Sequence, residues 1–233
     1  MPSLSERLVD LAGNAFLRTA EVTVAQPCAP GFVRVELRAE ALRGAEWAPG
    51  MKTQIRTQRG TLKLRAYTPI RWDGDTTELI ACTHADGPAA EWFRTVAAGD
   101  MCDVFGPRKS IDLRGIDRAV FVGDESSIAL AIALSGVTSR VDHVIEAADP
   151  DAATAVLAAH GLDRSSRVVA KPADPRALLD HVRGVTPDEP FVLVVTGNAK
   201  TVHEVRRDTR NWSLRPVEIK GKAYWAEGRT GLD

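Results

Sequence analysis

The sequence predicts two domains, an antiparallel β-barrel followed by a doubly wound parallel sheet, and three observations support this fold class. Short β-type segments separated by turn residues fill the chain from Ala20 to about Ile116. From Arg118 onward, strands alternate with helices. Several of the later strands are bare apolar runs, which is typical of strands covered on both faces. We therefore predict one domain over residues 1–116 and a second over residues 117–233.

Six strands are expected in the first domain, separated by turn dipeptides such as Pro30-Gly31 and Asp73-Gly74. They are Glu21–Ala25, Phe32–Leu37, Thr53–Thr57, Thr61–Tyr67, Thr77–Thr83 and Cys102–Phe105. Strands this closely spaced predict a small, closed, six-stranded antiparallel barrel. A helical turn is expected over Pro88–Ala98. The first 16 residues predict a short amphipathic helix because Leu4, Leu8 and Leu11 share one face.

The second domain is expected to be an open parallel sheet with helices on both faces. Its expected strands are Ala119–Val122, Val141–Ile145, Val168–Ala170, Phe191–Thr196 and Leu214–Ile219. Its expected helices are Ser126–Leu134, Pro150–His160, Pro175–Val182 and Thr201–Arg210. A barrel followed by such a sheet is, by analogy of fold alone, typical of proteins that hold a flavin on the barrel and a nicotinamide cofactor at the sheet edge.

Composition excludes several classes of function. The 233 residues include 30 basic and 31 acidic side chains, so a global basic field for nucleic acid is absent. No apolar run approaches the roughly 18 residues of a membrane helix, and the N-terminus lacks the features of a secretory signal. The three cysteines form no CxxC pair and the five histidines show no metal-ligand spacing. We expect a cytoplasmic protein without a membrane anchor or a bound metal.

The strongest local charge asymmetry lies between Met51 and Trp72, a segment with six basic residues and no acidic one. Strand alternation places Lys63, Arg65 and Tyr67 on one face. Such a face suits a ligand with phosphates and a flat ring, because Arg pairs with phosphate and Tyr stacks on rings. A solvated basic hairpin is the structural alternative for this segment.

Five ordered blocks extend this observation. They are Arg65-Ala66-Tyr67-Thr68-Pro69, the segment from His84 to Trp92, Phe105-Gly106-Pro107-Arg108, the segment from Val122 to Ile132, and Tyr224-Trp225-Ala226-Glu227-Gly228. In this order, from about Ala20 to Gly228, the chain resembles the siderophore-interacting proteins. These are FAD-containing ferric-siderophore reductases of the ferredoxin-NADP reductase superfamily.

The resemblance implies a set of FAD-binding residues in the first domain. Arg65 would pair with the FAD phosphate, while Tyr67 and Thr68 would contact the isoalloxazine ring. His84 would lie beside the flavin or its adenosine half, with a satisfied strand-end histidine as the structural alternative. Gly87 would allow close backbone approach, and Pro88, Ala89 and Ala90 would open a helix whose N–H groups face the pyrophosphate. Trp92 is expected in the core.

The second domain lacks a GxGxxG motif. Gly123-Asp124-Glu125-Ser126-Ser127 stands where a phosphate loop would be, yet its two carboxylates would repel a pyrophosphate. Ser126 and Ser127 are expected to cap the following helix. Glu146 would suit a ribose hydroxyl better than a 2′-phosphate. Arg206 and Arg207 match a helical Arg pair of the family, with a nucleotide or substrate role and a solvated helix face as the two alternatives. Gly197-Asn198 replaces the family's Gly-Glu, so the donor stays open among NADH, NADPH and reduced ferredoxin.

The expected activity is FAD-dependent reduction of a ferric siderophore to release Fe(II). Lys52, Arg56, Lys63 and Arg71 would attract the anionic chelate, and no general base, nucleophile or metal-binding side chain is required. One alternative is a flavoprotein that feeds electrons to another acceptor, such as a ferredoxin, an oxygenase or a biosynthetic enzyme. Another is a non-catalytic flavin-binding module.

Overall fold

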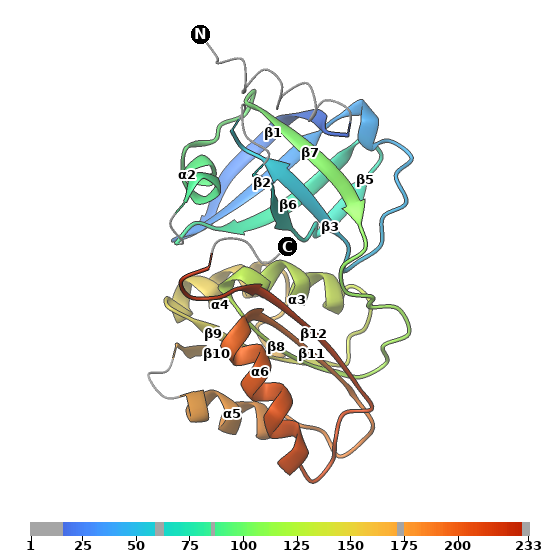
Figure 1. The fold of residues 1–233 in the computed structure, drawn as a ribbon, viewed down its shortest axis with the longest axis vertical. Helices are drawn as coiled ribbons and strands as arrows, with labels where there is room; N and C mark the ends of the chain where they lie inside the picture. Colours follow the sequence, from blue (N-terminus) through green and yellow to red (C-terminus); the bar gives the residue numbers. More distant parts are fainter. Residues whose placement is uncertain (1–15, 59–62, 85–86, 172–174, 230–233) are drawn as a thin grey trace. The chain divides into compact units, whose positions relative to one another are not determined.

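The computed structural model describes residues 16–58, 63–84, 87–171 and 175–229, and the chain divides into two compact units, Met1–Ser110 and Ile111–Asp233. Each unit has its own sheet and its own hydrophobic core (Figure 1). The division falls slightly before the join expected from the sequence, at residues 116/117. The expected N-terminal helix lies outside the described residues.

The first unit is built on a seven-stranded antiparallel sheet of order β4-β3-β7-β1-β2-β6-β5. Its strands are β1 (Arg18–Ala29), β2 (Phe32–Arg38), β3 (Lys52–Arg56), β4 (Arg65–Tyr67), β5 (Arg71–Asp73), β6 (Thr76–Cys82) and β7 (Met101–Arg108). β4 and β5 are the two ends of this order, yet only residues 68–70 separate them, so the sheet curls into a barrel-like form. Within the described residues no ladder joins β4 to β5. The expectation of six strands and full closure was therefore wrong in detail.

Alternating burial explains the core of this sheet. In β2, Val33, Val35 and Leu37 are buried while the residues between them are partly exposed, as expected for a strand with one covered face. The short 3₁₀ helix η1 (Glu40–Leu42) adds Leu42 to the same core, and the helix α2 (Pro88–Thr95) adds Phe93. Trp92 packs against this core, as predicted.

The second unit contains a five-stranded parallel sheet of order β10-β9-β8-β11-β12. The strands are β8 (Ala119–Asp124), β9 (Val141–Ala147), β10 (Ser166–Ala170), β11 (Val192–Asn198) and β12 (Glu218–Trp225). The helices are η2 (Glu125–Ser127), α3 (Ile128–Ser135), α4 (Pro150–Ala159), α5 (Pro175–Arg183), α6 (Ala199–Asp208) and η3 (Thr209–Asn211). The predicted doubly wound sheet is confirmed.

Helices cover both faces of this sheet, α3 and α4 on one side and α5 and α6 on the other (Figure 1). Every residue of β8 is buried, because this central strand is covered on both faces. The last strand begins at Glu218, later than expected, and Leu214 packs against the core from an irregular segment. Pro216 lacks the N–H that a ladder needs, which accounts for the later start. No described helix is long and apolar enough to cross a membrane.

Candidate functional site

The edge strand β4 carries Arg65 and Tyr67 on one face, as the alternation predicted. Arg65 is partly buried, and its Nη1 donates to the carbonyl of Leu64 at 2.9 Å. No carboxylate of the described residues pairs with this guanidinium. The Tyr67 ring meets Phe93 of α2 edge-on, with centroids 4.8 Å apart, and burial raises the pKa of the Tyr67 hydroxyl. This contact brings β4 and α2 together within one unit.

The start of α2 is open toward solvent. Gly87 precedes the helix with φ of +125°, a conformation that favours glycine, and a Cβ there would meet no atom within 4 Å. Pro88 opens the helix, followed by Ala89 and Ala90, so the expected helix start is confirmed. Helix N-termini carry unpaired N–H groups and a partial positive charge. An anionic group can therefore approach the backbone at this point.

His84 packs against the turn between β1 and β2. An added Cβ at Gly31 would lie 1.9 Å from His84 Nε2, so only glycine leaves room for the ring. The ring also meets Phe32 edge-on at 6.1 Å, and Nδ1 lies 3.7 Å from the sulfur of Cys82. These contacts fix the position of an otherwise exposed imidazole. Thr68 follows β4 directly and is partly buried.

Arg56 does not join the expected group of surface cations. It is 3% exposed, and its Nε and Nη2 donate to Asp103 Oδ2 at 2.9 and 2.6 Å across β3 and β7. A buried guanidinium bonded to a buried carboxylate serves the fold. The expectation that Arg56 attracts an anionic chelate was wrong, because the Arg56 side chain is buried against Asp103 and does not reach the surface.

The remaining three expected substrate cations lie apart. Lys52 begins β3, and Lys63 is exposed just before β4. Arg71 lies on β5, at the other end of the sheet order, where its guanidinium is 3.3 Å from Glu36 and 3.5 Å from Glu78. Arg71 is thus set apart by its two carboxylate partners, and Lys52 and Lys63 stay the proposed cations beside β4.

In the second unit, Asp124 fills the place where a phosphate would be expected. The order of the sheet reverses between β8 and β11, and ligands of open α/β sheets bind beyond the strand ends at such a switch point. The Asp124 carboxylate accepts hydrogen bonds there from Ser126 N, Asn198 N and Trp225 Nε1 at 2.7 to 3.0 Å, and from Ser126 Oγ. Burial raises the pKa of Asp124, while the bonds from Ser126 and Trp225 lower it. The carboxylate thus uses donors from the starts of two helices.

The expectation that Ser126 and Ser127 cap the helix was wrong, and Asn198 and Trp225 join the site although sequence reasoning assigned them no such role. Asp124 caps the following 3₁₀ turn, whereas Ser127 makes no capping bond and its Oγ accepts from Thr196. Gly197 has φ of +105°, and an added Cβ would lie 2.5 Å from Asp124 Oδ2. The Asp preference for N-caps and the unusual Gly197-Asn198 pair were signals for this contact.

Two more carboxylates surround Asp124. Glu125 is buried, accepts from Ala148 N, and pairs with Lys171 Nζ at 2.7 Å, while that ammonium lies 5.3 Å from the centre of the Trp225 ring. Glu146 at the end of β9 accepts from Thr201 Oγ1 at 2.8 Å, and burial raises the pKa of Glu146. No group of three or more metal-binding side chains was found in the described part of the chain. Each of the three carboxylates at the switch point is therefore paired with a donor of the same unit.

Comparison with known proteins shows the fold, and a family model matches part of the chain. The model of the family described as "Siderophore-interacting protein" matches residues 116–228, a range that includes the Gly123–Ser127 and Tyr224–Gly228 blocks but not the Arg65 and His84 blocks. No curated protein sequence matches the chain.

Solved structures match over both units. A siderophore utilization protein from T. fusca is 20% identical with a TM-score of 0.72, and the match covers 93% of this chain and 95% of that one. The siderophore-interacting protein SipS from Aeromonas hydrophila is 18% identical with a TM-score of 0.74, covering 92% and 93%. Phthalate dioxygenase reductase is 12% identical with a TM-score of 0.71, covering 93% and 70%. The fold is that of the ferredoxin-reductase-like proteins.

Proposed function

We propose that the chain is a siderophore-interacting protein and acts as an FAD-dependent reductase that releases iron from a ferric siderophore, since the model of that family matches residues 116–228. The observation that carries the cofactor proposal is the partly buried Arg65 guanidinium, which has no carboxylate partner among the described residues and shares a face of β4 with Tyr67. Buried or partly buried cations are normally paired, so this one favours an anionic ligand.

The residues present fit an FAD. Arg65 would pair with a phosphate of the cofactor. The start of α2, which Gly87 and Pro88 open, offers the backbone N–H groups of Ala89 and Ala90 to the pyrophosphate. Tyr67 and Thr68 would contact the flat ring system, with Tyr67 held in position by Phe93. His84, fixed against Gly31, would lie beside the flavin or its adenosine half.

Bound FAD supplies the capacity to take two electrons from a donor and to release them singly to Fe(III). Hard oxygen ligands hold Fe(III) more tightly than Fe(II), so reduction loosens the metal from its chelator. The protein's own part is to bind the cofactor and to attract an anionic chelate, for which Lys52 and Lys63 near β4 are the proposed side chains. NADH, NADPH or reduced ferredoxin is the proposed source of electrons.

The test starts with the visible spectrum of the purified protein. A yellow protein that bleaches under anaerobic addition of a donor, and then yields Fe(II) to a ferrous trap from a ferric siderophore, is the expected result. Arg65→Ala should lower FAD affinity by about tenfold or more, since it removes a charge-assisted phosphate contact. Arg38→Ala, an exposed residue paired with Glu21, is the matched control and should keep full occupancy.

The outcomes separate the alternatives. A colourless protein that refuses added FAD would overturn the proposal. Bleaching without iron release would favour a flavoprotein that serves another acceptor. Two proteins of similar structure have names of this kind, the ferredoxin reductase in carbazole 1,9a-dioxygenase and phthalate dioxygenase reductase. A yellow protein that no donor bleaches would favour a non-catalytic flavin-binding module.

A further inference from the structure

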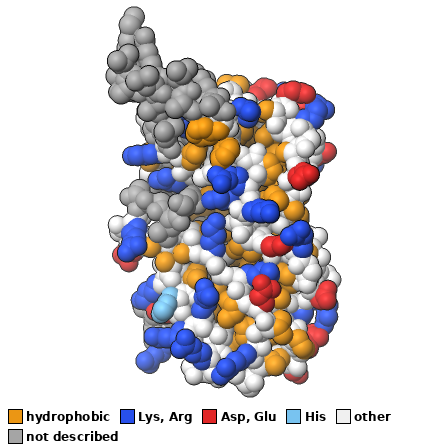
Figure 2. Space-filling view, turned by 45° about the vertical axis from the view of Figure 1, so that its right-hand side comes forward, with side chains coloured by type: hydrophobic (Ala, Val, Ile, Leu, Met, Phe, Trp, Pro, Cys, Tyr) orange, Lys and Arg blue, Asp and Glu red, His pale blue; other side chains and the backbone are white. Residues whose placement is uncertain are grey.

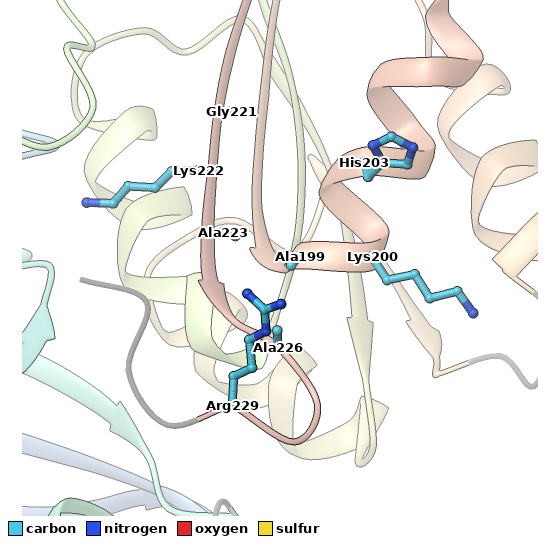
Figure 3. A pocket seen from close by; sticks show the side chains of 8 residues that line it. All are labelled: Ala199, Lys200, His203, Gly221, Lys222, Ala223, Ala226 and Arg229. Atoms are coloured by element: carbon cyan, nitrogen blue, oxygen red, sulfur yellow. The ribbon is translucent and has the colours of Figure 1, made fainter.

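A groove runs between the start of α6 and the end of β12, wholly within the second unit (Figure 3). Its volume is about 790 Å³, a size typical of small-molecule sites. The floor is made of small residues, Ala199, Gly221, Ala223 and Ala226. Larger side chains at these positions would fill the space, so a ligand can approach the backbone closely here.

The rim of the groove is cationic. Lys200, His203, Lys222 and Arg229 line it, and none of the described lining residues is acidic. Arg229 follows a turn in which its N–H bonds to Ala226 O, and Figure 3 shows its guanidinium turned back toward Ala199 and Ala223. In the same view Lys200 and His203 come from α6, whereas Lys222 leaves β12 on the other side.

Neighbouring residues add to the positive potential. Arg206, one turn beyond His203, lies beside Gly221, where an added Cβ would be 3.4 Å from Arg206 Cδ. Lys200 Nζ lies 4.0 Å from Glu204 Oε1, one turn along the same helix, so this carboxylate offsets little of the lysine's charge. Figure 2 shows blue Lys and Arg atoms gathered around a pale blue His on the visible face of this unit. Several cations around a hollow favour an anion with more than one charge.

The usual place for such an anion is the switch point at the end of β8, and the Asp124 carboxylate occupies it. At the switch point, Asp124 uses the N–H groups of Ser126 and Asn198, and Glu125 lies buried beside it. A pyrophosphate there would have to displace one carboxylate and would be repelled by the other. The groove lies at the start of α6, directly after Asn198, so it offers a positive surface on the same edge of the sheet.

We propose that the groove between α6 and β12, rather than the loop from β8 to α3, binds the phosphate groups of a nicotinamide dinucleotide. Lys200 and Arg229 would pair with the phosphates, and His203 would donate a ring N–H. The identity of this nucleotide rests on the proposed reductase function. The phosphate site itself rests only on the groove.

The experiment is isothermal titration of the FAD-loaded protein with ADP, inorganic pyrophosphate, NADH and NADPH. ADP and both dinucleotides should bind, with affinity falling as NaCl is raised. Arg229→Ala and Lys200→Ala should each weaken ADP binding by about fivefold, a magnitude discounted for solvent exposure. Arg207→Ala, on the same helix but outside the groove, is the control and should bind ADP as the unaltered protein does.

A second pair of variants tests the location. Ala226→Glu adds a carboxylate inside the groove and should abolish detectable ADP binding. Ser126→Glu adds one at the exposed position of the β8–α3 loop and should leave binding within about twofold. Strong loss in Ser126→Glu with none in Lys200→Ala or Arg229→Ala would overturn the proposal, as would absence of ADP and dinucleotide binding.

Failure of the two proposals can be told apart. A protein that is colourless but binds ADP through Lys200 and Arg229 would keep the phosphate site and lose the reductase. A yellow protein that reduces ferric siderophore but binds no nucleotide would keep the reductase and lose this site. Binding of pyrophosphate alone, with neither ADP nor a dinucleotide, would count against a nucleotide and overturn the assignment.

Discussion

The face of β4 in the first unit and the switch point of the second unit differ in how charge is balanced. On β4, the Arg65 guanidinium has no carboxylate partner among the described residues. At the switch point, the Asp124 carboxylate is saturated by donors of its own unit, and Glu125 is paired with Lys171. An anionic ligand would complete the first region but would compete with the protein in the second. A strand end at the expected position is therefore not sufficient for a phosphate site.

The largest expected effect is on stability at the switch point. Gly197→Ala would force an L-residue to φ of +105° and press its Cβ against the Asp124 carboxylate. We expect a loss of about 4 kcal/mol in the free energy of unfolding, from backbone strain and displaced buried hydrogen bonds. Urea denaturation measures it. Gly161→Ala, with φ of +72° but open space around the Cβ, is the control and should lose about 1 kcal/mol. Equal losses in both variants would contradict a closed carboxylate site.

Arg56→Ala tests the paired cation of the first unit. It leaves the buried Asp103 carboxylate without its guanidinium, while the Thr19 hydroxyl still donates to Asp103 Oδ1. We expect a loss of about 3 kcal/mol by urea denaturation. The exposed Arg38→Ala should change stability by less than about 0.5 kcal/mol. A small loss in Arg56→Ala would mean that this arginine is available to a ligand after all.

Glu146→Gln tests how much the buried charge of Glu146, close to Asp124 and Glu125, lowers the free energy of unfolding. Burial raises the pKa of Glu146, so the folded state favours its protonated form, and its contribution to stability is lost as pH rises through the folded pKa. Gln keeps an oxygen for the Thr201 hydroxyl and carries no charge. We expect the variant to be more stable by about 1 kcal/mol at pH 7, with the gain vanishing below the ordinary pKa. Thermal denaturation at pH 4 and pH 7 measures this. A gain that is equal at both pH values would contradict the electrostatic cause.

The smallest expected effect on stability is at Arg65. Arg65→Ala removes a guanidinium that donates to the adjacent carbonyl of Leu64 and, among the described residues, pairs with no carboxylate, so we expect less than about 0.5 kcal/mol of change without added cofactor. Calorimetric melting of the cofactor-free protein measures this value. A large loss would assign Arg65 to the fold, in the same way as Arg56, and would end the contrast between the two regions.

Periodicity predicted most of the fold, and the misses have local causes. Alternation and apolar runs located the main strands, because burial on one or both faces leaves a pattern in the residues themselves. β5 was missed because its three residues, Arg71–Asp73, are largely polar and are defined by pairing with β6. Closure was overestimated because it depends on pairing between β4 and β5, which no single-strand pattern encodes.

The candidate sites were predicted only where the signal was local. Arg65 and Tyr67 share a face because they are two residues apart on a strand, so alternation was sufficient. Arg56 follows the same rule, but its burial depends on Asp103, which is distant in sequence. The available signal was Asp103, which lies between the apolar residues Cys102 and Val104 of a strand. A buried carboxylate needs a cationic or hydrogen-bonding partner, and Arg56 is that partner. The hydrogen bonds that Asn198 N and Trp225 Nε1 donate to Asp124 join three strand ends, and only the folded sheet brings these ends together.

Trp225 lies where its fluorescence depends on the positions of Asp124 and Lys171. Its indole N–H bonds to Asp124, and the Lys171 ammonium lies over its ring. Any event that moves this carboxylate or this lysine changes the polarity around the indole. The chain has five tryptophans, so the difference in fluorescence emission between the unaltered protein and Trp225→Phe isolates this indole and follows the sheet edge without a label.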